Sequence, residues 1–302
     1  MPSMRSQLIP ADTQARFVAA GDDSPRTARP RSPVAKANAE PEAAVSGRFP
    51  VSASRAWPEI RARLRGAHRG AILLDFDGTL VNLRRRPSDV RMAAEVRRVL
   101  QRLVGHTNLF VAIVSGRKVR NLRKLIHVEG LHYFGVHGGE MGGKSARLTK
   151  KARFALEGAK HAARLQLGVI EGIWIEDKRL SFSVHYREAD AAAAKRGQSV
   201  LFDLLAPWGD ALHVLNGSRV WEILPIEIPG KSSVIEEVLS QLPVGATVVY
   251  IGDDSTDEMA FAVLPDQITV RVGRAPATSA RYLLRDPADV LRFLARLEKE
   301  LP

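Results

Sequence analysis

The sequence predicts an α/β fold in which a Rossmann-like parallel sheet forms a core and an α+β cap domain is inserted into it. Two observations predict the core: short apolar runs alternate with segments of helical period, and several of those runs end in polar residues. A third observation predicts the insert, because strand pairs of alternating polarity replace this pattern between residues 137 and 225. We therefore expect an extension over residues 1–50, a core over residues 51–136 and 226–302, and a cap over residues 137–225.

Composition limits the class of protein and of partner. Of the 302 residues, 45% are hydrophobic, which is enough for a sizeable core, and the lack of cysteine excludes disulfides and thiolate metal sites. The formal net charge of +12 favours anionic partners, such as a phosphorylated small molecule or nucleic acid. The sequence has no zinc-finger or RNA-binding motif and no apolar run long enough to span a membrane. We therefore expect a small-molecule partner, and neither nucleic acid nor a membrane.

The first part of the chain differs from the rest. Residues 1–50 are rich in proline, alanine, serine and arginine and show no persistent period, which predicts a disordered segment. They also lack the apolar stretch of a secretory signal, so we expect a cytoplasmic protein. A helix over residues 56–68 is expected to lead into the first strand. The sequence does not determine the oligomeric state, and a monomer is the simplest expectation.

Two acids follow the first core strand, residues 71–74. Asp75 and Asp77 are separated by one residue, so on an extended backbone their carboxylates lean to the same side. Acids this close repel each other unless a cation lies between them, and Mg²⁺ prefers oxygen ligands. A carboxylate here can also act as a nucleophile. Gly78 permits a sharp turn, and an ordinary Asp-Gly turn followed by a capping Thr79 is the simpler reading.

Two further polar residues stand at element ends. Ser115 follows a strand over residues 109–114 and precedes a helix, where a hydroxyl can bind a phosphoryl oxygen. Lys231 opens a helix over residues 231–242, and an anion nearby would offset its unfavourable place at a helix start. Taken alone, a helix-capping serine and a surface lysine are the simpler interpretations.

A second acidic pair follows another apolar strand, residues 247–251. Asp253 and Asp254 place like charges at a buried strand end, which again indicates a cation. Ser255 and Glu258 have the spacing of a capping box, which explains Glu258 without a catalytic role.

The remaining elements complete the expected fold. Asn216-Gly217 predicts a two-residue hairpin turn in the insert, and the glycine-rich stretch around His137 predicts a hinge between core and insert. The other helices are expected over residues 88–104, 152–167, 190–205 (capped by Asp190) and 288–301, and the other strands over residues 132–136, 173–176, 180–186, 212–215, 219–223 and 268–272.

Taken in order, Asp75-x-Asp77, Ser115, Lys231 and Asp253-Asp254 resemble the four motifs of the haloacid-dehalogenase superfamily, and the chain is more narrowly similar to the trehalose-6-phosphate phosphatase family. The resemblance covers roughly residues 71–297. One departure is Ser232, where the family usually has glycine after the motif lysine. The segments that carry the narrower resemblance are Leu74-Asp75-Phe76-Asp77-Gly78-Thr79-Leu80, Val114-Ser115-Gly116-Arg117, His137-Gly138, Glu176-Asp177-Lys178, His185-Tyr186-Arg187, Val220-Trp221-Glu222-Ile223-Leu224-Pro225 and Gly252-Asp253-Asp254 with Thr256-Asp257-Glu258 and Phe261.

This resemblance implies catalytic roles. Asp75 is expected to attack phosphorus and form an aspartyl-phosphate, and Asp77 to protonate the leaving sugar oxygen and then activate water. Ser115 and Lys231 are expected to stabilise charge on the phosphoryl oxygens.

The resemblance also implies a cofactor and a substrate site. Mg²⁺ would be held by Asp75, the Asp77 backbone carbonyl and Asp253, with Asp254 and Asp257 in support. The implied substrate-binding residues are Gly78, Thr79, Arg117, His137, Glu176, Lys178, Arg187 and Glu222.

The function implied is hydrolysis of trehalose 6-phosphate to trehalose and phosphate, in trehalose biosynthesis. Another sugar phosphate, such as sucrose phosphate or a mannosyl phosphoglycerate, is the alternative substrate. A nucleic-acid-binding module and a catalytically dead scaffold are alternatives of other classes. The absence of a recognition motif argues against the first, and the complete set of acids with the lysine argues against the second.

Overall fold

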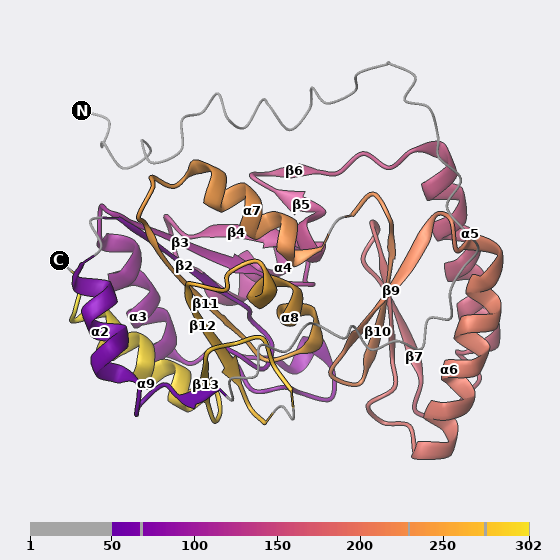
Figure 1. The fold of residues 1–302 in the computed structure, drawn as a ribbon. Helices are drawn as coiled ribbons and strands as arrows, with labels where there is room; N and C mark the ends of the chain where they lie inside the picture. The colour runs from indigo at the N-terminus through magenta and orange to yellow at the C-terminus, as the bar shows by residue number, and fades with distance from the viewer. Residues whose placement is uncertain (1–49, 67–68, 229, 275–276, 302) are drawn as a thin grey trace.

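The computed structural model describes residues 50–66, 69–228, 230–274 and 277–301. Apart from Pro50, the predicted extension over residues 1–50 therefore lies outside the described residues. Within the described ranges, the strands form one nine-stranded and one four-stranded sheet (Figure 1).

The large sheet has the order β1-β13-β12-β11-β2-β3-β4-β5-β6. In this order, neighbouring strands from β1 through β13, β12, β11, β2 and β3 to β4 pair in parallel. At the β4 edge, β5 and β6 are added as antiparallel strands. Because β2 lies between β3 and β11, the carboxyl ends of these three strands are neighbours. The strands are β1 (Val51–Ser52), β2 (Gly70–Leu74), β3 (Leu109–Val114), β4 (His132–Gly135), β5 (Glu140–Met141), β6 (Lys144–Ser145), β11 (Thr247–Gly252), β12 (Ile268–Val272) and β13 (Tyr282–Leu284).

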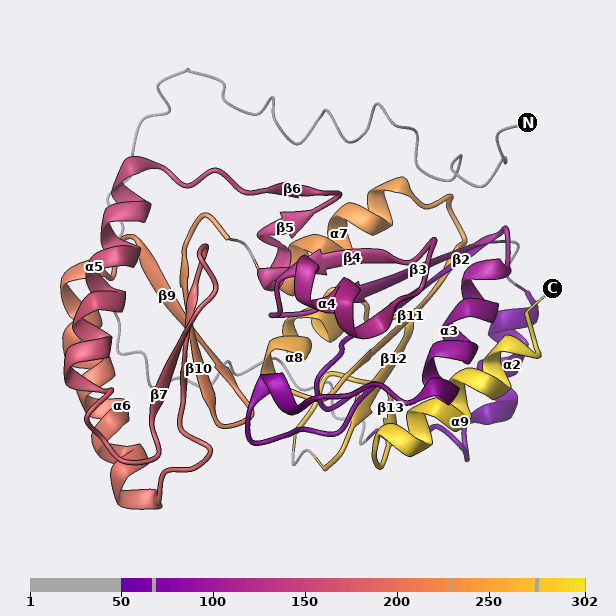
Figure 2. The same ribbon diagram turned by 180° about the vertical axis from the view of Figure 1, so that it is seen from behind.

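Helices cover both faces of this sheet, and the buried strands are apolar on both faces for that reason. Along β2, Ile72 and Leu74 pack with one group of helices, whereas Ala71 and Leu73 pack with the other. Figures 1 and 2 show the two groups on opposite sides. One group is α2 (Trp57–Arg65), α3 (Ala94–Gly105), α4 (Val119–Ile126) and α9 (Pro287–Glu298), and the other is α7 (Lys231–Gln241) and α8 (Ser255–Ala262).

The small sheet is antiparallel and has the order β7-β8-β10-β9. Two helices cover its outer face, and its other face is directed toward the large sheet (Figure 2). Asp190 caps the second helix as predicted, because its side chain accepts a hydrogen bond from the Ala193 amide. These elements are β7 (Trp174–Asp177), β8 (Phe182–His185), β9 (Leu212–Gly217), β10 (Val220–Pro225), α5 (Lys150–Gln166) and α6 (Ala191–Leu205).

The helix predicted over residues 88–104 starts later than expected. A 3₁₀ turn, Pro87–Asp89, is followed by extended backbone, and α3 begins at Ala94. Val90 is extended and fully buried, so its side chain anchors this stretch in the core and delays the helix. Two further 3₁₀ turns are Val136–Gly138 and Ala206–Trp208.

The hairpin turn predicted at Asn216-Gly217 is displaced by two residues. Gly217 belongs to β9 and pairs with Val220, and the turn is Ser218-Arg219, with Arg219 at φ +60°. A Cβ atom on Gly217 would lie 2.8 Å from a Val220 methyl carbon and 3.3 Å from the Asp254 carboxylate. The glycine is therefore needed for close packing rather than for a turn.

Some residues predicted to belong to the insert pair with the large sheet of the core. Residues 140–145, predicted within the insert, pair along the edge of the large sheet as β5 and β6. The predicted division into domains stays a prediction. Among the described helices, we find none with the length and hydropathy needed to cross a bilayer.

Candidate active site

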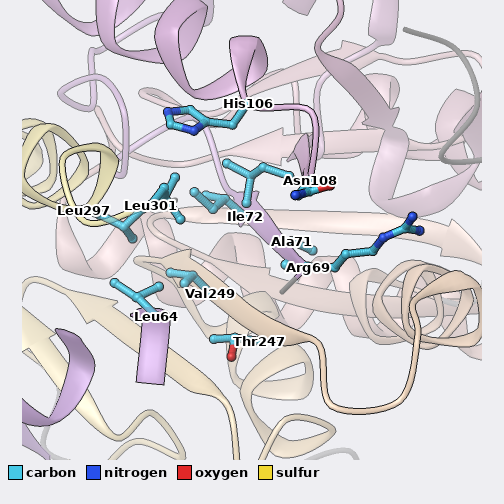
Figure 3. A pocket seen from close by; sticks show the side chains of 12 residues that line it. Leu64, Arg69, Ala71, Ile72, His106, Asn108, Thr247, Val249, Leu297 and Leu301 are labelled. Atoms are coloured by element: carbon cyan, nitrogen blue, oxygen red, sulfur yellow. The ribbon is translucent and has the colours of Figure 1, made fainter. Parts of the chain in front are cut away.

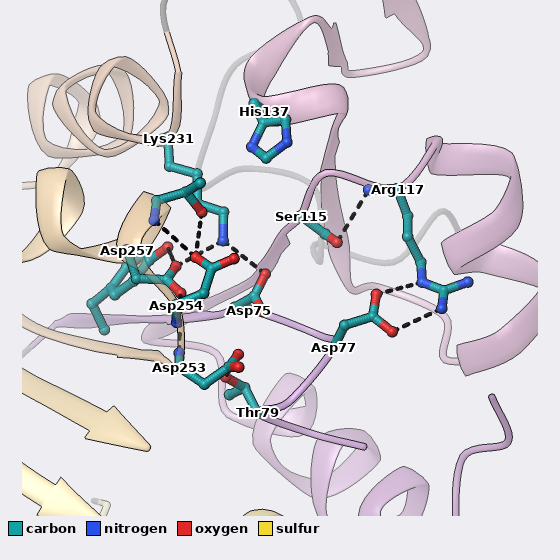
Figure 4. Close-up of polar contacts among 12 residues, drawn as sticks. Asp75, Asp77, Thr79, Ser115, Arg117, His137, Lys231, Asp253, Asp254 and Asp257 are labelled. Carbon is teal, nitrogen blue, oxygen red and sulfur yellow. Dashed lines mark hydrogen bonds and ion pairs between the residues drawn. The ribbon is translucent and has the colours of Figure 1, made fainter. Parts of the chain in front are cut away.

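The polar residues predicted at strand ends come together at the carboxyl edge of the large sheet. Asp75 follows β2, Ser115 follows β3 and Asp253 follows β11, and Figure 4 shows them around one space. Parallel sheets place ligands at this edge. The Asp75 amide donates to the Ile251 carbonyl at 2.9 Å, so β11 fixes the backbone that carries this carboxylate.

Lys231 joins the acids from the first position of α7. Its buried Nζ donates to Oδ1 of Asp75 at 2.9 Å and to Oδ1 of Asp257 at 2.7 Å. Burial opposes its charge, but these two carboxylates outweigh burial and raise the pKa of Lys231 well above its usual value. A buried ammonium with two carboxylate partners stays charged, as the stabilisation of a phosphoryl group requires.

Three carboxylates form a cluster that one lysine does not balance. Oxygen atoms of Asp75, Asp253 and Asp257 lie within 4.8 Å of one another. Burial, aided by the neighbouring acids, raises the pKa of Asp75 to about 8 and that of Asp253 well above its usual value. Without a cation, ionisation of Asp75 and Asp253 is therefore disfavoured. A compact set of oxygen ligands with surplus negative charge fits a hard divalent cation such as Mg²⁺.

Asp257 holds this cluster in place through hydrogen bonds. Its carboxylate accepts hydrogen bonds from the Tyr250 hydroxyl at 2.7 Å and from the amides of Asp253 and Asp254 at 3.0 and 3.1 Å, in addition to Lys231. Burial opposes ionisation, but Lys231 and these donors lower its pKa. Asp257 therefore remains ionised and fixes the loop that carries Asp253.

The capping box of α8 lies one residue before the predicted one. Asp254 is the N-cap and accepts from the Thr256 amide at 2.9 Å, with Asp257 as its partner three residues later. The predicted pair of Ser255 and Glu258 is therefore wrong. An aspartate at the N-cap satisfies the free amides of the first turn as well as serine would.

Gly78 and Thr79, whose substrate binding stays a prediction, lie against an acid of the cluster. Gly78 has φ +85°, and a Cβ atom there would lie 2.0 Å from Oδ2 of Asp253. The Thr79 hydroxyl donates to Oδ1 of Asp253 at 3.1 Å. In this structure, both residues shape the surroundings of Asp253.

Asp77 is paired with a residue of the second motif. Nη2 of Arg117 donates to Oδ1 of Asp77 at 2.7 Å, and Nε donates to Oδ2. The Arg117 guanidinium is held in turn by Asn121 at 2.8 Å, and the Arg117 amide donates to the Ser115 hydroxyl at 3.2 Å. Figure 4 shows the Asp77 carboxylate directed toward Arg117, away from Lys231.

The small sheet supplies the opposite wall of the site. A pocket lies between the two sheets and is open to solvent. Apart from Gly78, Thr79 and the supporting Asp257, every predicted site residue lines it, namely Asp75, Asp77, Ser115, Arg117, His137, Glu176, Lys178, Arg187, Glu222, Lys231, Asp253 and Asp254.

The polar groups of the small sheet that face this pocket are mostly paired. Glu222 is buried and accepts from Nζ of Lys178 at 2.6 Å and from the Ser183 hydroxyl at 2.8 Å. Glu176 and Nε2 of His185 lie 3.0 Å apart. Burial opposes the charge of Glu176, but this hydrogen bond and Lys178 outweigh it and lower its pKa to about 2.

Arg187 and His137, the other two predicted residues, also line the pocket. Arg187 donates to the Ser218 carbonyl at 2.7 Å and to the Arg84 carbonyl, so it links the small sheet to a core loop. His137 is buried between Gly116 and Glu222, and neither ring nitrogen has a hydrogen-bond partner among the described residues.

Three residues that hold site side chains were not predicted from the sequence: Asn121, Tyr250 and Ser183. Ser183 pairs with Glu222 in the register between β8 and β10, so only a known register would have found it. Tyr250 lies in the apolar strand before Asp253. A tyrosine hydroxyl in a buried strand needs a hydrogen-bond partner, and this could have indicated its contact with a nearby acid.

A second crevice offers no comparable chemistry. It lies near the opposite ends of the same strands and is mainly apolar (Figure 3). None of the described residues that line it is a carboxylate. We therefore place the candidate active site at the carboxyl edge of the sheet.

Comparison with known proteins identifies a family. A family model described as trehalose-phosphatase matches residues 73–287, more than half of the chain. The chain belongs to the trehalose-phosphatase family. Among members of the trehalose-phosphatase family, the trehalose-phosphate phosphatase of Mycobacterium tuberculosis (strain ATCC 25618 / H37Rv) is 32% identical over 249 residues, or 78% of this chain and 63% of the relative. The chain thus spans about 63% of the length of these mycobacterial relatives.

Solved structures show the same fold. The C-terminal domain of trehalose-6-phosphate phosphatase from C. albicans has a TM-score of 0.70 at 22% identity, covering 85% of this chain and 100% of that one. A haloacid dehalogenase-like hydrolase from Bacteroides thetaiotaomicron has a TM-score of 0.54 at 16% identity, covering 76% and 99%. The predicted fold class and the resemblance to the trehalose-phosphatase family are both confirmed.

Proposed function

We propose that this chain hydrolyses trehalose 6-phosphate to trehalose and phosphate with the help of a divalent cation. The observation that carries the proposal is a buried carboxylate, Asp75, held by Lys231 at the floor of a pocket whose opposite wall presents Glu222 and Lys178. The floor suits a phosphate monoester and the wall suits a hydroxyl-rich group. Membership of the trehalose-phosphatase family supports this assignment.

The reaction would proceed in two steps. An oxygen of Asp75 attacks phosphorus, the bond from phosphorus to the sugar oxygen breaks, and an aspartyl-phosphate forms. Water then attacks the phosphorus of this intermediate and releases phosphate, which restores the Asp75 carboxylate. Lys231 and Ser115 would stabilise the charge that develops on the phosphoryl oxygens.

Asp77 would move the protons. It would protonate the sugar oxygen as it leaves, and then accept a proton from the attacking water. Its two hydrogen bonds with Arg117 orient the carboxylate. Because this carboxylate is directed toward Arg117 (Figure 4), we expect Asp77 to turn toward the sugar oxygen when it acts as the acid.

Mg²⁺ would be held by Asp75, the Asp77 carbonyl and Asp253, with Asp257 and Asp254 behind them. Bound there, it would supply positive charge to the acidic cluster and to the phosphoryl oxygens.

The small sheet would hold the sugar. Glu176, Lys178 and Glu222 offer acceptors and a donor to sugar hydroxyls, which both donate and accept hydrogen bonds. Arg187 would keep the small sheet close to the core through the Arg84 carbonyl. Closure over the sugar would exclude bulk water from the reacting groups. The cytoplasmic location and the monomeric state stay predictions.

A panel of sugar phosphates tests the proposal. We expect kcat/KM to be highest for trehalose 6-phosphate, and activity to depend on Mg²⁺. The panel should include sucrose phosphate, mannosyl phosphoglycerate, glucose 6-phosphate and p-nitrophenyl phosphate, with and without a chelator. A preference for another sugar phosphate would replace the substrate assignment, and the absence of phosphate release from all of them would contradict the enzymatic function.

A further inference from the structure

One buried side chain of the pocket has no function in the reaction described above. The imidazole of His137 is almost fully buried, and neither of its nitrogens has a hydrogen-bond partner among the described residues. Buried polar groups are normally hydrogen-bonded, so an exception at a ligand pocket needs an explanation. The ring lines the pocket together with Ser115 from the core and Glu222 from the small sheet.

The backbone at His137 is held in an unfavourable conformation. Val136, His137 and Gly138 have consecutive positive φ angles of 48°, 52° and 96°. Such angles are uncommon for residues other than glycine; histidine adopts them more readily than most, but a β-branched valine is an outlier that persists only when the surroundings enforce it. Here the Val136 amide donates to the Arg117 carbonyl at 3.0 Å, and the His137 amide donates to the Ser115 carbonyl at 3.1 Å. The strained turn is therefore bound to the loop that carries the phosphoryl-binding serine.

The ring itself touches the same loop. A Cβ atom on Gly116 would lie 2.6 Å from Nε2 of His137, so the imidazole lies directly against the Gly116 backbone. A shift of the ring would therefore displace the Gly116 backbone and the residues on either side of it. One of these is Ser115, whose hydroxyl accepts from the Arg117 amide at 3.2 Å.

The same ring nitrogen also lies near the small sheet. Nε2 of His137 is 3.9 Å from Oε2 of Glu222, just beyond hydrogen-bond distance. That oxygen already accepts from the Ser183 hydroxyl, and a carboxylate oxygen has room for a second donor. Burial and the charges of Lys178 and Lys231 lower the pKa of His137 well below its usual value, so the ring is neutral and has one N–H to donate.

We propose that His137 is a positioning residue that couples the small sheet to the phosphoryl-binding loop. When a bound sugar draws Glu222 toward the core, Nε2 of His137 donates a hydrogen bond to Oε2 of Glu222. The ring is then fixed against Gly116 and holds Ser115 in place for the transferred phosphoryl group. This inference rests on the proposed function only in requiring a phosphorylated sugar, whichever sugar that is.

A double-mutant cycle tests the coupling, with each variant compared on the sugar phosphate that the wild-type chain hydrolyses fastest. His137→Asn removes the donor at the Nε2 position, and asparagine tolerates a positive φ better than most residues. His137→Gln places an amide donor near the Nε2 position. Glu222→Ala removes the acceptor, and combining it with His137→Asn completes the cycle.

We expect His137→Asn to lower kcat/KM by about 10-fold or more, mainly through kcat, and His137→Gln to recover it to within about 3-fold of wild type. In the Glu222→Ala background, His137→Asn should cost about 2-fold or less, because its partner is already absent. Thermal melts of all variants report whether the fold is retained.

Independent effects of the two residues, or a glutamine variant no better than asparagine, would overturn the coupling. Kinetic losses that follow a fall in melting temperature would do the same, since they indicate a merely structural role. If the fastest substrate is not trehalose 6-phosphate, the proposed substrate is wrong. The double-mutant cycle still measures the coupling between His137 and Glu222 in that case. A wild-type chain that hydrolyses no sugar phosphate would overturn both.

Discussion

Lys231 determines the charge state of the pocket floor. A buried ammonium is costly unless it is paired, and here it is shared between Asp75 and Asp257. Among the described residues, Asp75 then has a single ion-pair partner, Lys231, and Asp253 has none. This imbalance is what the proposed cation would offset.

The glutamates of the small sheet give a prediction at this scale. Glu222→Ala and Glu176→Ala should each lower kcat/KM for trehalose 6-phosphate relative to that for p-nitrophenyl phosphate by about 10-fold, the equivalent of roughly 1.4 kcal/mol of binding in the transition state. The reason is that only the sugar reaches these carboxylates. Steady-state kinetics on both substrates measure the ratio.

Glu171→Ala is the matched control, because this exposed glutamate lies in the same part of the chain but outside the pocket. Its ratio should match that of wild type. Equal losses on both substrates in the Glu222 and Glu176 variants would show that these residues act on folding or closure, and would exclude a role in specificity.

Most elements were predictable because their signals are local. The apolar runs gave β3 and β11 to within a residue, and Asp190 indicated its helix start. The misplaced boundaries have tertiary causes. The start of α3 is delayed by burial of Val90, and Gly217 serves packing against Asp254 rather than a turn.

The site was predictable to the same extent. The strand-end acids, Ser115 and Lys231 do meet, since parallel strands share one carboxyl edge. The pairing of Asp77 with Arg117 was not foreseen, because it depends on how the loop after β3 folds back. The contact of Ser183 with Glu222 required the register of an antiparallel pair.

Gly78, in the turn after β2, gives a prediction at the scale of elements. Gly78→Ala should weaken Mg²⁺ binding by about 10-fold or more and lower kcat, because a Cβ atom would collide with the Asp253 carboxylate at 2.0 Å. Isothermal titration calorimetry with Mg²⁺ measures the affinity.

Gly143→Ala is the control for backbone strain alone. Gly143 has φ +81°, close to the +85° of Gly78, but a Cβ atom there meets nothing within 4 Å. Both variants should lose about 1–2 kcal/mol of stability from the left-handed backbone. If Gly143→Ala weakens Mg²⁺ binding as much as Gly78→Ala does, contact with Asp253 is not the cause.

At the scale of the molecule, two sheets of different kinds build one pocket. The parallel sheet provides the acids and the lysine, and the antiparallel sheet provides groups suited to hydroxyls. The wall on the small sheet is carried on a hydrophobic cluster beneath α5 and α6 that is separate from the clusters of the large sheet. A reaction that must admit a sugar and then exclude water fits such an arrangement.

The acidic cluster predicts how metal binding depends on pH. Without a cation, the pKa of Asp75 is raised from 3.8 to about 8, so between these values the folded chain binds more protons than the unfolded chain. The stability of the metal-free protein should therefore fall as pH rises through this window. Mg²⁺ needs the ionised carboxylates, so the increase in melting temperature on adding Mg²⁺ should be larger at pH 8 than at pH 6. An equal or smaller increase at pH 8 would contradict the metal site.

The most direct measurement compares phosphate release from trehalose 6-phosphate, in the presence of Mg²⁺, by wild-type protein and by Asp75→Asn. The substitution keeps the shape of the side chain, removes its nucleophilic oxygen and removes a buried charge, so the fold should persist in circular dichroism and thermal melts. We expect wild type to turn over and the variant to lose at least about 10³-fold in kcat, the scale expected when a nucleophile is removed. Phosphate release at the wild-type rate by the folded Asp75→Asn chain would contradict the central claim that Asp75 attacks the phosphate.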